Sequence, residues 1–194
     1  MNFLAHFHLA WPDPGLLAGA LEGDYYKGPL RGDLPEELER GVRLHRAIDA
    51  YTDAHPRSAQ LRTELPPTLR RYAGILIDLS FDHFLSLHWQ HFADLPLPQF
   101  SGHVYQSLAA SEQHFSPAAR DMLATLIEHD ILNLYDEWRT VTTTAERIGG
   151  RFRRHNPFLD VRTQLTPLRG ALESAFVDFY PQLQHFSREQ TGTL

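Results

Sequence analysis

The stretch Ile75-Leu-Ile-Asp-Leu-Ser-Phe-Asp-His-Phe-Leu85 decides the fold class of this chain. It lies inside Ala73–Leu87, a segment that is apolar almost all round, and this pattern is typical of a helix buried at the centre of a domain. Pro66 and Pro67 suit the first turn of a helix, so we expect the central helix to begin there and to run to about Phe92.

The segments on either side also show helical rather than alternating periodicity, and proline and glycine clusters separate them. Pro35–Ala54 is predicted as a helix because its first turn combines a proline with acidic residues, which the helix dipole favours. Further helices are expected over Leu16–Lys27, Pro98–Ser111, Ser116 to about Tyr135, Thr142–Gly149 and Leu168–Phe186. The prediction is an all-α, single-domain helical bundle over residues 1–194, with roughly six to eight helices.

Composition excludes several kinds of protein. The 194 residues contain no cysteine, which rules out disulfides, thiolate metal sites and a cysteine nucleophile, and they contain twelve histidines. A net charge of −6 argues against general nucleic-acid binding, and no apolar run is long enough for a membrane span. Met1–Trp11 is apolar but has no lysine or arginine, unlike a signal peptide, so we expect a cytoplasmic protein.

Charged residues interrupt the predicted central helix. Asp78 and Asp82 are four residues apart and share one helix face, and His83 follows directly. A buried carboxylate is usually paired or bound to a metal, because an uncompensated buried charge is costly. Either aspartate alone could cap a helix or pair with Arg70 or Arg71, but the pair together with His83 favours a metal or catalytic site.

The helix predicted over Pro35–Ala54 has a similar pattern. His45 and Asp49 are four residues apart, and Asp53 continues the same row. Facing helices with such stripes build metal sites in helical proteins, although a solvated face with internal pairs is the alternative, above all for Asp53. Asp and His ligands without Cys suit Mn²⁺, Mg²⁺, Fe²⁺ or Zn²⁺, and such ions assist phosphoester hydrolysis.

Four further positions are weaker candidates. Asp24 lies in a glycine-flanked segment and could equally be a turn residue, and Lys27 nearby could hold a phosphate or be solvated. His6 and His8 are two residues apart, a spacing that places them on one side of a strand but on different sides of a helix. Each histidine alone is more typical of a packing residue than of a ligand.

Several of these motifs together resemble the acyl carrier protein (ACP) phosphodiesterase family. The matching stretches are Met1–Ala10, Gly23–Gly28, Gly41–Pro56, Arg70-Arg71, Asp78, and Asp82-His-Phe-Leu85 with Trp89. The resemblance implies a helical fold related to HD-domain phosphohydrolases and a divalent metal, usually Mn²⁺. It also implies a reaction, hydrolysis of the phosphodiester that joins 4′-phosphopantetheine to a serine of holo-ACP, with apo-ACP and free 4′-phosphopantetheine as products.

With the resemblance, the candidate residues fall into groups. The predicted metal ligands and their supporting groups are Asp24, His45, Asp49, Asp78, Asp82 and His83, of which Asp24, His45, Asp78 and Asp82 rank first as catalytic residues. Phosphate-binding candidates are Lys27, Arg46, Arg70 and Arg71, since a guanidinium suits phosphate oxygens. His6, His8 and Asp53 are second-tier candidates. A metal takes four to six ligands including water, so some of the predicted group must contact the ligands rather than the metal itself.

Two departures and two open questions accompany the resemblance. Ala20 stands where the family usually has an asparagine, and His129-Asp130 spells an HD dipeptide outside the matching motifs, which favours a helix-end pair. The basic cluster from Arg147 to His155 could dock an acidic ACP or could be a solvated loop.

The alternative functions are an HD-like metal phosphohydrolase acting on a small nucleotide or another phosphoester, and a non-catalytic helical protein that binds a metal or a partner.

Overall fold

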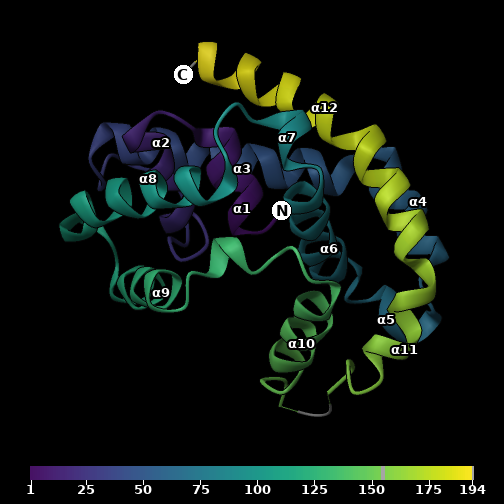
Figure 1. The fold of residues 1–194 in the computed structure, drawn as a ribbon. Helices are drawn as coiled ribbons and strands as arrows, with labels where there is room; N and C mark the ends of the chain where they lie inside the picture. Colours follow the sequence, from purple (N-terminus) through teal and green to yellow (C-terminus); the bar gives the residue numbers. More distant parts are fainter. Residues whose placement is uncertain (154–155, 194) are drawn as a thin grey trace.

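Helices make up the regular structure of the chain in the computed structural model, which describes residues 1–153 and 156–193 (Figure 1). No strand occurs in these residues, so the all-α prediction is confirmed. The α-helices are α1 (Phe3–Ala10), α2 (Pro14–Glu22), α3 (Glu36–Ala54), α4 (Pro56–Glu64), α5 (Pro67–Arg70), α6 (Ala73–Leu87), α7 (Trp89–Phe92), α8 (Leu97–Ala110), α9 (Pro117–Glu128), α10 (Trp138–Gly149), α11 (Val161–Leu165) and α12 (Arg169–Thr193). Across the described part of the chain, no helix has the length and apolar character needed to cross a membrane.

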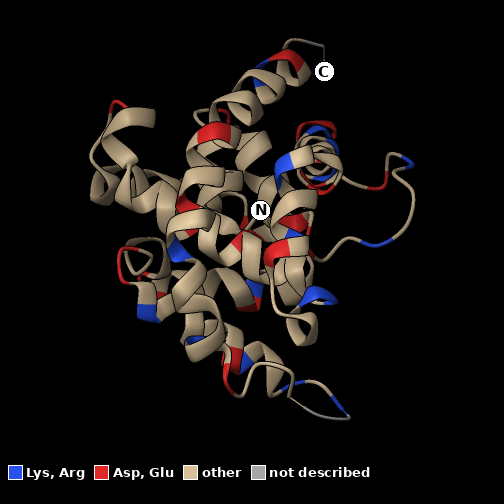
Figure 2. Cartoon of the chain, turned by 90° about the vertical axis from the view of Figure 1, so that its right-hand side faces the viewer, with Lys and Arg blue, Asp and Glu red and all other residues tan. Residues whose placement is uncertain are grey.

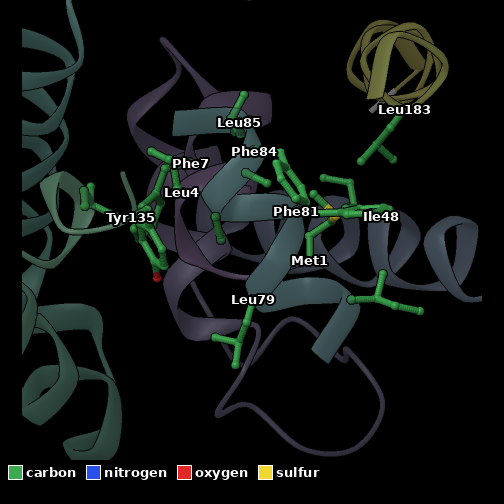
Figure 3. Close-up of a cluster of buried hydrophobic side chains, with 14 of the residues drawn as sticks. Met1, Leu4, Phe7, Ile48, Leu79, Phe81, Phe84, Leu85, Tyr135 and Leu183 are labelled. Atoms are coloured by element: carbon green, nitrogen blue, oxygen red, sulfur yellow. The ribbon is translucent and has the colours of Figure 1, made fainter. Parts of the chain in front are cut away.

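Helix α6 is the buried centre of the fold, as the sequence predicts. It packs against α1, α4, α10 and α12. Phe81, Phe84 and Leu85 on α6 are fully buried, and Figure 3 shows them among Phe7 of α1, Ile48 of α3 and Leu183 of α12. Burying side chains of this size stabilises the fold by roughly 1.5–3 kcal/mol each, which explains why the apolar segment forms the core.

The single helix expected from Pro66 to about Phe92 is divided into α5, α6 and α7. The backbone leaves helical geometry at Tyr72 and at His88, with ψ near 16° at both residues. Arg70 turns back and donates to the carbonyl oxygens of Leu65 and Thr63, which closes the end of α4 rather than extending a helix. The prediction of one long helix was therefore wrong at both ends.

Other boundaries differ in the same direction, towards more and shorter helices than expected. Helix α2 ends at Glu22 instead of Lys27, α4 was not predicted, and α9 ends at Glu128 rather than near Tyr135. Ser116 caps α9 by accepting a hydrogen bond from the amide of Ala119, as its place before a proline suggests. Helix α12 is an exception, because it continues beyond the predicted end at Phe186 to Thr193.

Close packing of α2 on α3 positions part of the site. A side chain at Gly41 would place its Cβ 2.7 Å from both the carbonyl oxygen of Gly15 and the Cα of Gly19, and both are backbone atoms of α2. Only glycine permits this approach. The chain leaving α2 therefore runs directly alongside α3, with Asp24 near His45.

Helix α1 is attached to α6 by its first turn. The carboxylate of Asp82 accepts hydrogen bonds from the amides of Leu4, at 2.8 Å, and Ala5, at 3.2 Å. These N–H groups lie at a helix N-terminus, where they have no partner within the helix and where negative charge is favourable. The contact sets the position of α1, and with it the position of His6.

Candidate metal centre

Two imidazoles and one carboxylate converge where α1 meets α3. Nε2 of His6 lies 3.1 Å from Oδ1 of Asp49, and Nε2 of His45 lies 3.2 Å from Oδ2 of the same residue. The two rings stack with centroids 4.0 Å apart. One ligand atom from each of the three residues lies within 4.8 Å of the other two, a spacing that a single metal ion can bridge.

Two further carboxylates and an amine border this group. Oδ1 of Asp24, just after α2, lies 3.7 Å from Nε2 of His45. The amino group of Met1 lies 3.3 Å from Oδ1 of Asp49 and 3.0 Å from Oδ1 of Asp78 on α6. Four segments of the chain thus meet at one point, and the amine supplies positive charge between two of the carboxylates.

The imidazoles form the floor of the site and the carboxylates form its opening. The side chains of His6 and His45 are 3% exposed, whereas those of Asp24 and Asp49 are 46% and 44% exposed. Nδ1 of His45 is 3.0 Å from the carbonyl oxygen of Ala20. With the proton on Nδ1 donated to that oxygen, Nε2 faces the carboxylates. It donates a hydrogen bond to Asp49 when the ring is protonated and would offer its lone pair to a metal, which is the usual arrangement of a metal-binding histidine.

The donor set fits a divalent cation. Nδ1 of His6 is buried without a hydrogen-bond partner in the described part of the chain. Its opposite nitrogen, like that of His45, faces Asp49. Two imidazole nitrogens and a carboxylate suit Mn²⁺, Fe²⁺ or Zn²⁺ better than Mg²⁺, which prefers oxygen ligands.

Burial and charge shift the pKa values of these groups in different directions. Burial lowers the pKa of His6 to about 3, and the charge of His45 acts in the same direction. Burial alone would raise the pKa of Asp49, but hydrogen bonds with His45 and His6 outweigh it and hold that pKa well below its usual range. The site therefore keeps a neutral His6 beside an ionised Asp49, the protonation states that metal binding requires.

The pKa values of Asp24 and Asp78 shift in the opposite direction from that of Asp49. Burial raises the pKa of both carboxyls. For Asp24 the charge of His45 opposes the increase, and for Asp78 the amine of Met1 does so. Carboxyls with raised pKa values at the opening of a site are suited to proton transfer.

Gly23 allows the segment that carries Asp24 to approach His45. A Cβ at position 23 would lie 2.4 Å from Cγ of His45 and 2.7 Å from its Cδ2. Any side chain at this position would displace the imidazole. Ala20, in the preceding turn, contributes its backbone carbonyl oxygen to His45.

Asp82 and His83, predicted among the ligands, do not join this group. Both carboxylate oxygens of Asp82 are occupied by the amides at the start of α1, and burial raises its pKa to about 7. Nδ1 of His83 lies 2.6 Å from the carbonyl oxygen of Tyr135, and Nε2 lies 3.4 Å from Arg169. The sequence places these residues on α6, but neighbouring helices occupy their polar atoms.

Of the second-tier candidates, only His6 lies at the site, because residues two apart point to different sides of a helix. His6 belongs to the group, whereas His8 points away and is held between the hydroxyl of Tyr180 and the carbonyl oxygen of Phe92. Asp53 is exposed and pairs with Arg62. His129 and Asp130 lie at the end of α9, in agreement with a helix-end pair.

The predicted phosphate-binding residues have contacts elsewhere. Lys27 donates to the carbonyl oxygen of Asp24, and Arg46 donates to that of Tyr26 and lies over its ring. Arg70 closes α4, and Arg71 is exposed. Lys27 and Arg46 remain near the segment that carries Asp24, and Arg70 is committed to backbone oxygens.

The sequence placed His6 in the second tier, whereas the structure brings it next to His45 and Asp49. Its only sequence signal was an imidazole in an apolar segment, and that signal is the same for His8. The distinguishing feature is tertiary, because the Asp82 contact turns α1 so that His6 rather than His8 faces α3.

The fold and the site together define an all-α protein with a cluster of imidazole and carboxylate donors between buried helices. A family model described as acyl carrier protein phosphodiesterase matches residues 1–183. The chain belongs to this family. No solved structure matches it significantly.

Curated relatives support the same assignment. A protein named acyl carrier protein phosphodiesterase from Klebsiella pneumoniae (strain 342) is 32% identical over 191 residues, covering 98% of this chain and 99% of the relative. Proteins of the same name from Enterobacter sp. (strain 638) and Yersinia pestis are 32% and 30% identical, over 94% and 95% of this chain and 95% and 98% of their own lengths. The similarity therefore extends over the helices that build the site and those that surround it.

Proposed function

We propose that this chain is a metal-dependent phosphodiesterase that hydrolyses the bond between 4′-phosphopantetheine and a serine of holo-ACP. The observation that carries the proposal is the convergence of His6, His45 and Asp49 in a protein whose full-length relatives are named acyl carrier protein phosphodiesterase. The products would be apo-ACP and free 4′-phosphopantetheine.

The three converging residues would hold the metal, for which Mn²⁺ is our first choice. A bound divalent cation would lower the pKa of a water molecule and stabilise negative charge on the phosphoryl oxygens. His45 is oriented for this role by the carbonyl oxygen of Ala20, and His6 by its contact with Asp49. The burial of both imidazoles excludes bulk water from the floor of the site.

Asp24 is the residue that we assign to proton transfer. The departing serine oxygen needs a proton, and Asp24 combines a raised pKa with a half-exposed carboxyl at the opening. Asp78 lies 3.0 Å from the amine of Met1, and its carboxylate would balance the positive charge of that amine. Lys27 and Arg46, on or beside the Asp24 segment, are the phosphate-binding candidates that this proposal retains.

Mass spectrometry of the protein substrate tests the proposal directly. Purified protein is incubated with holo-ACP and Mn²⁺, and the mass of the ACP should fall by one phosphopantetheine. The Asp49→Asn variant should leave it unchanged. An unchanged ACP together with hydrolysis of a nucleotide would instead support a small-molecule phosphohydrolase. Metal binding without hydrolysis of either substrate would support a non-catalytic protein.

A further inference from the structure

The end of α10 and the loop after it form a basic surface. From Arg147 to His155 the sequence contains four arginines and no acidic residue. Arg147, Arg151 and Arg153 are exposed, and none of them forms an ion pair within the part of the chain that the structure describes. Arg154 lies outside the described residues. Figure 2 shows basic residues on the loop that leads into the grey trace at the lower edge.

Several arginines elsewhere in the fold have acidic partners. Arg43 pairs with Glu39, Arg57 with Asp178, and Arg62 with Asp53. Unpaired guanidinium groups gathered in one segment instead leave their positive potential available to an external anion or an acidic surface.

The base of this loop is well anchored. The side chain of Asn156 donates to the carbonyl oxygen of Glu146, and its own oxygen accepts from the amide of Phe158. The ring of Phe158 is fully buried. Asn156 and Phe158 are therefore attached to the helical core.

Apolar side chains lie among the arginines. Phe152 is 38% exposed and Leu159 is 73% exposed. Arginine beside exposed aromatic and aliphatic groups is a composition enriched at protein–protein contacts, whereas a solvated loop does not require it. This combination favours a protein partner over a free anion.

The basic surface is connected to the helix that carries Asp78. Phe152 packs on Tyr72, with ring centroids 5.2 Å apart, and Tyr72 directly precedes α6. Asp78 follows six residues later, about 9 Å along the helix axis at 1.5 Å per residue.

We propose that Arg147, Arg151, Phe152, Arg153 and Leu159 form the docking surface for the acidic protein that carries the scissile phosphodiester. This inference rests on the proposed function, because the substrate is then attached to a protein. The phosphorus is bonded directly to a serine oxygen of that protein, so the surface of the partner must border the site during hydrolysis. A basic surface that packs on the start of α6, the helix that carries Asp78, is positioned for such a contact, and it offsets the net negative charge of the whole chain locally.

A binding measurement without chemistry separates docking from catalysis. Fluorescence anisotropy of labelled apo-ACP, which has no phosphodiester, reports docking alone. The double variant Arg151→Glu/Arg153→Glu should weaken binding about tenfold or more, and binding by the wild type should itself weaken as salt screens the charges. The matched control is Arg120→Glu/Arg188→Glu, which makes the same charge change at exposed positions on α9 and α12 and should bind within about twofold of the wild type.

Hydrolysis assays complete the test. The Arg151→Glu/Arg153→Glu variant should raise KM for holo-ACP while hydrolysing the small diester bis(p-nitrophenyl) phosphate at the wild-type rate. Equal binding by this variant and the wild type, or an equal loss in the control, would overturn the docking surface. Wild-type binding of apo-ACP without hydrolysis of holo-ACP would leave the docking surface supported and would refute the proposed function.

Discussion

The imidazoles of His6 and His45 stack with their ring centroids 4.0 Å apart and their planes inclined by 12°. One ring comes from α1 and the other from α3, and each directs Nε2 towards a different oxygen of Asp49. Two buried rings whose nitrogens face one carboxylate form a candidate set of metal ligands, and the first two predictions below depend on this geometry.

Replacing Asp49 should abolish metal binding. In Asp49→Asn the carboxylate that bridges both imidazoles becomes a neutral amide, so affinity for Mn²⁺ should fall more than about 100-fold, and phosphodiesterase activity with it. Isothermal titration calorimetry with MnCl₂ measures the loss. Asp53→Asn, on the same helix but paired with Arg62, is the control and should bind Mn²⁺ like the wild type. Equal affinities in the two variants would place the metal elsewhere.

A methyl group at Gly23 should disturb the site without a charge change. In Gly23→Ala the new Cβ would lie 2.4 Å from Cγ of His45, so the ring must move. We expect Mn²⁺ affinity to fall about 10–100-fold, comparable to the loss of a group that orients a ligand. Gly74→Ala, on α6, is the matched variant because no atom lies within 4 Å of a Cβ built there. If Gly23→Ala binds Mn²⁺ as tightly as Gly74→Ala, His45 is not a ligand.

Asp82 should contribute to stability through its cap of α1. Asp82→Ala leaves the buried amides of Leu4 and Ala5 without acceptors, and we expect the free energy of unfolding to fall by about 1–3 kcal/mol. Urea denaturation followed by circular dichroism measures this change. Asp53→Ala removes an exposed carboxylate and should cost at most about 0.5 kcal/mol. A similar small loss in Asp82→Ala would contradict the capping role.

His8 should make stability depend on pH. Burial lowers its pKa from 6.5 to about 4, so between these values the unfolded chain binds more protons than the folded one. The contribution of His8 to stability is therefore complete above pH 6.5 and falls as the pH drops towards 4, by about 3 kcal/mol. Thermal melts of His8→Gln across this range should show a shallower pH dependence than the wild type.

The exposed His114 provides the reference for that measurement. His114→Gln, in the short 3₁₀ helix Glu112–His114, should keep the wild-type pH dependence. The slope is compared rather than the absolute melting temperature, because His8→Gln also loses contacts with Tyr180 and Phe92. An unchanged slope in His8→Gln would show that His8 is not protonated on acid unfolding.

The sequence by itself determined the all-α class, the helix over Glu36–Ala54 and the buried α6. These features follow from residue spacing along one segment, since an apolar face with helical period must be covered. The same spacing predicted that His45 and Asp49 share a face of α3, and the structure brings them together.

The tertiary structure decided which polar groups meet. Asp78 and Asp82 have the same spacing signal, yet Asp78 borders the site while Asp82 caps α1. His6 and His8 have nearly the same sequence context, yet only His6 faces α3. Helical periodicity specifies a face of one helix, whereas the partner of that face depends on packing between helices far apart in the chain. Here that packing depends on the approach of α2 to α3 at Gly41 and on the attachment of α1 to α6.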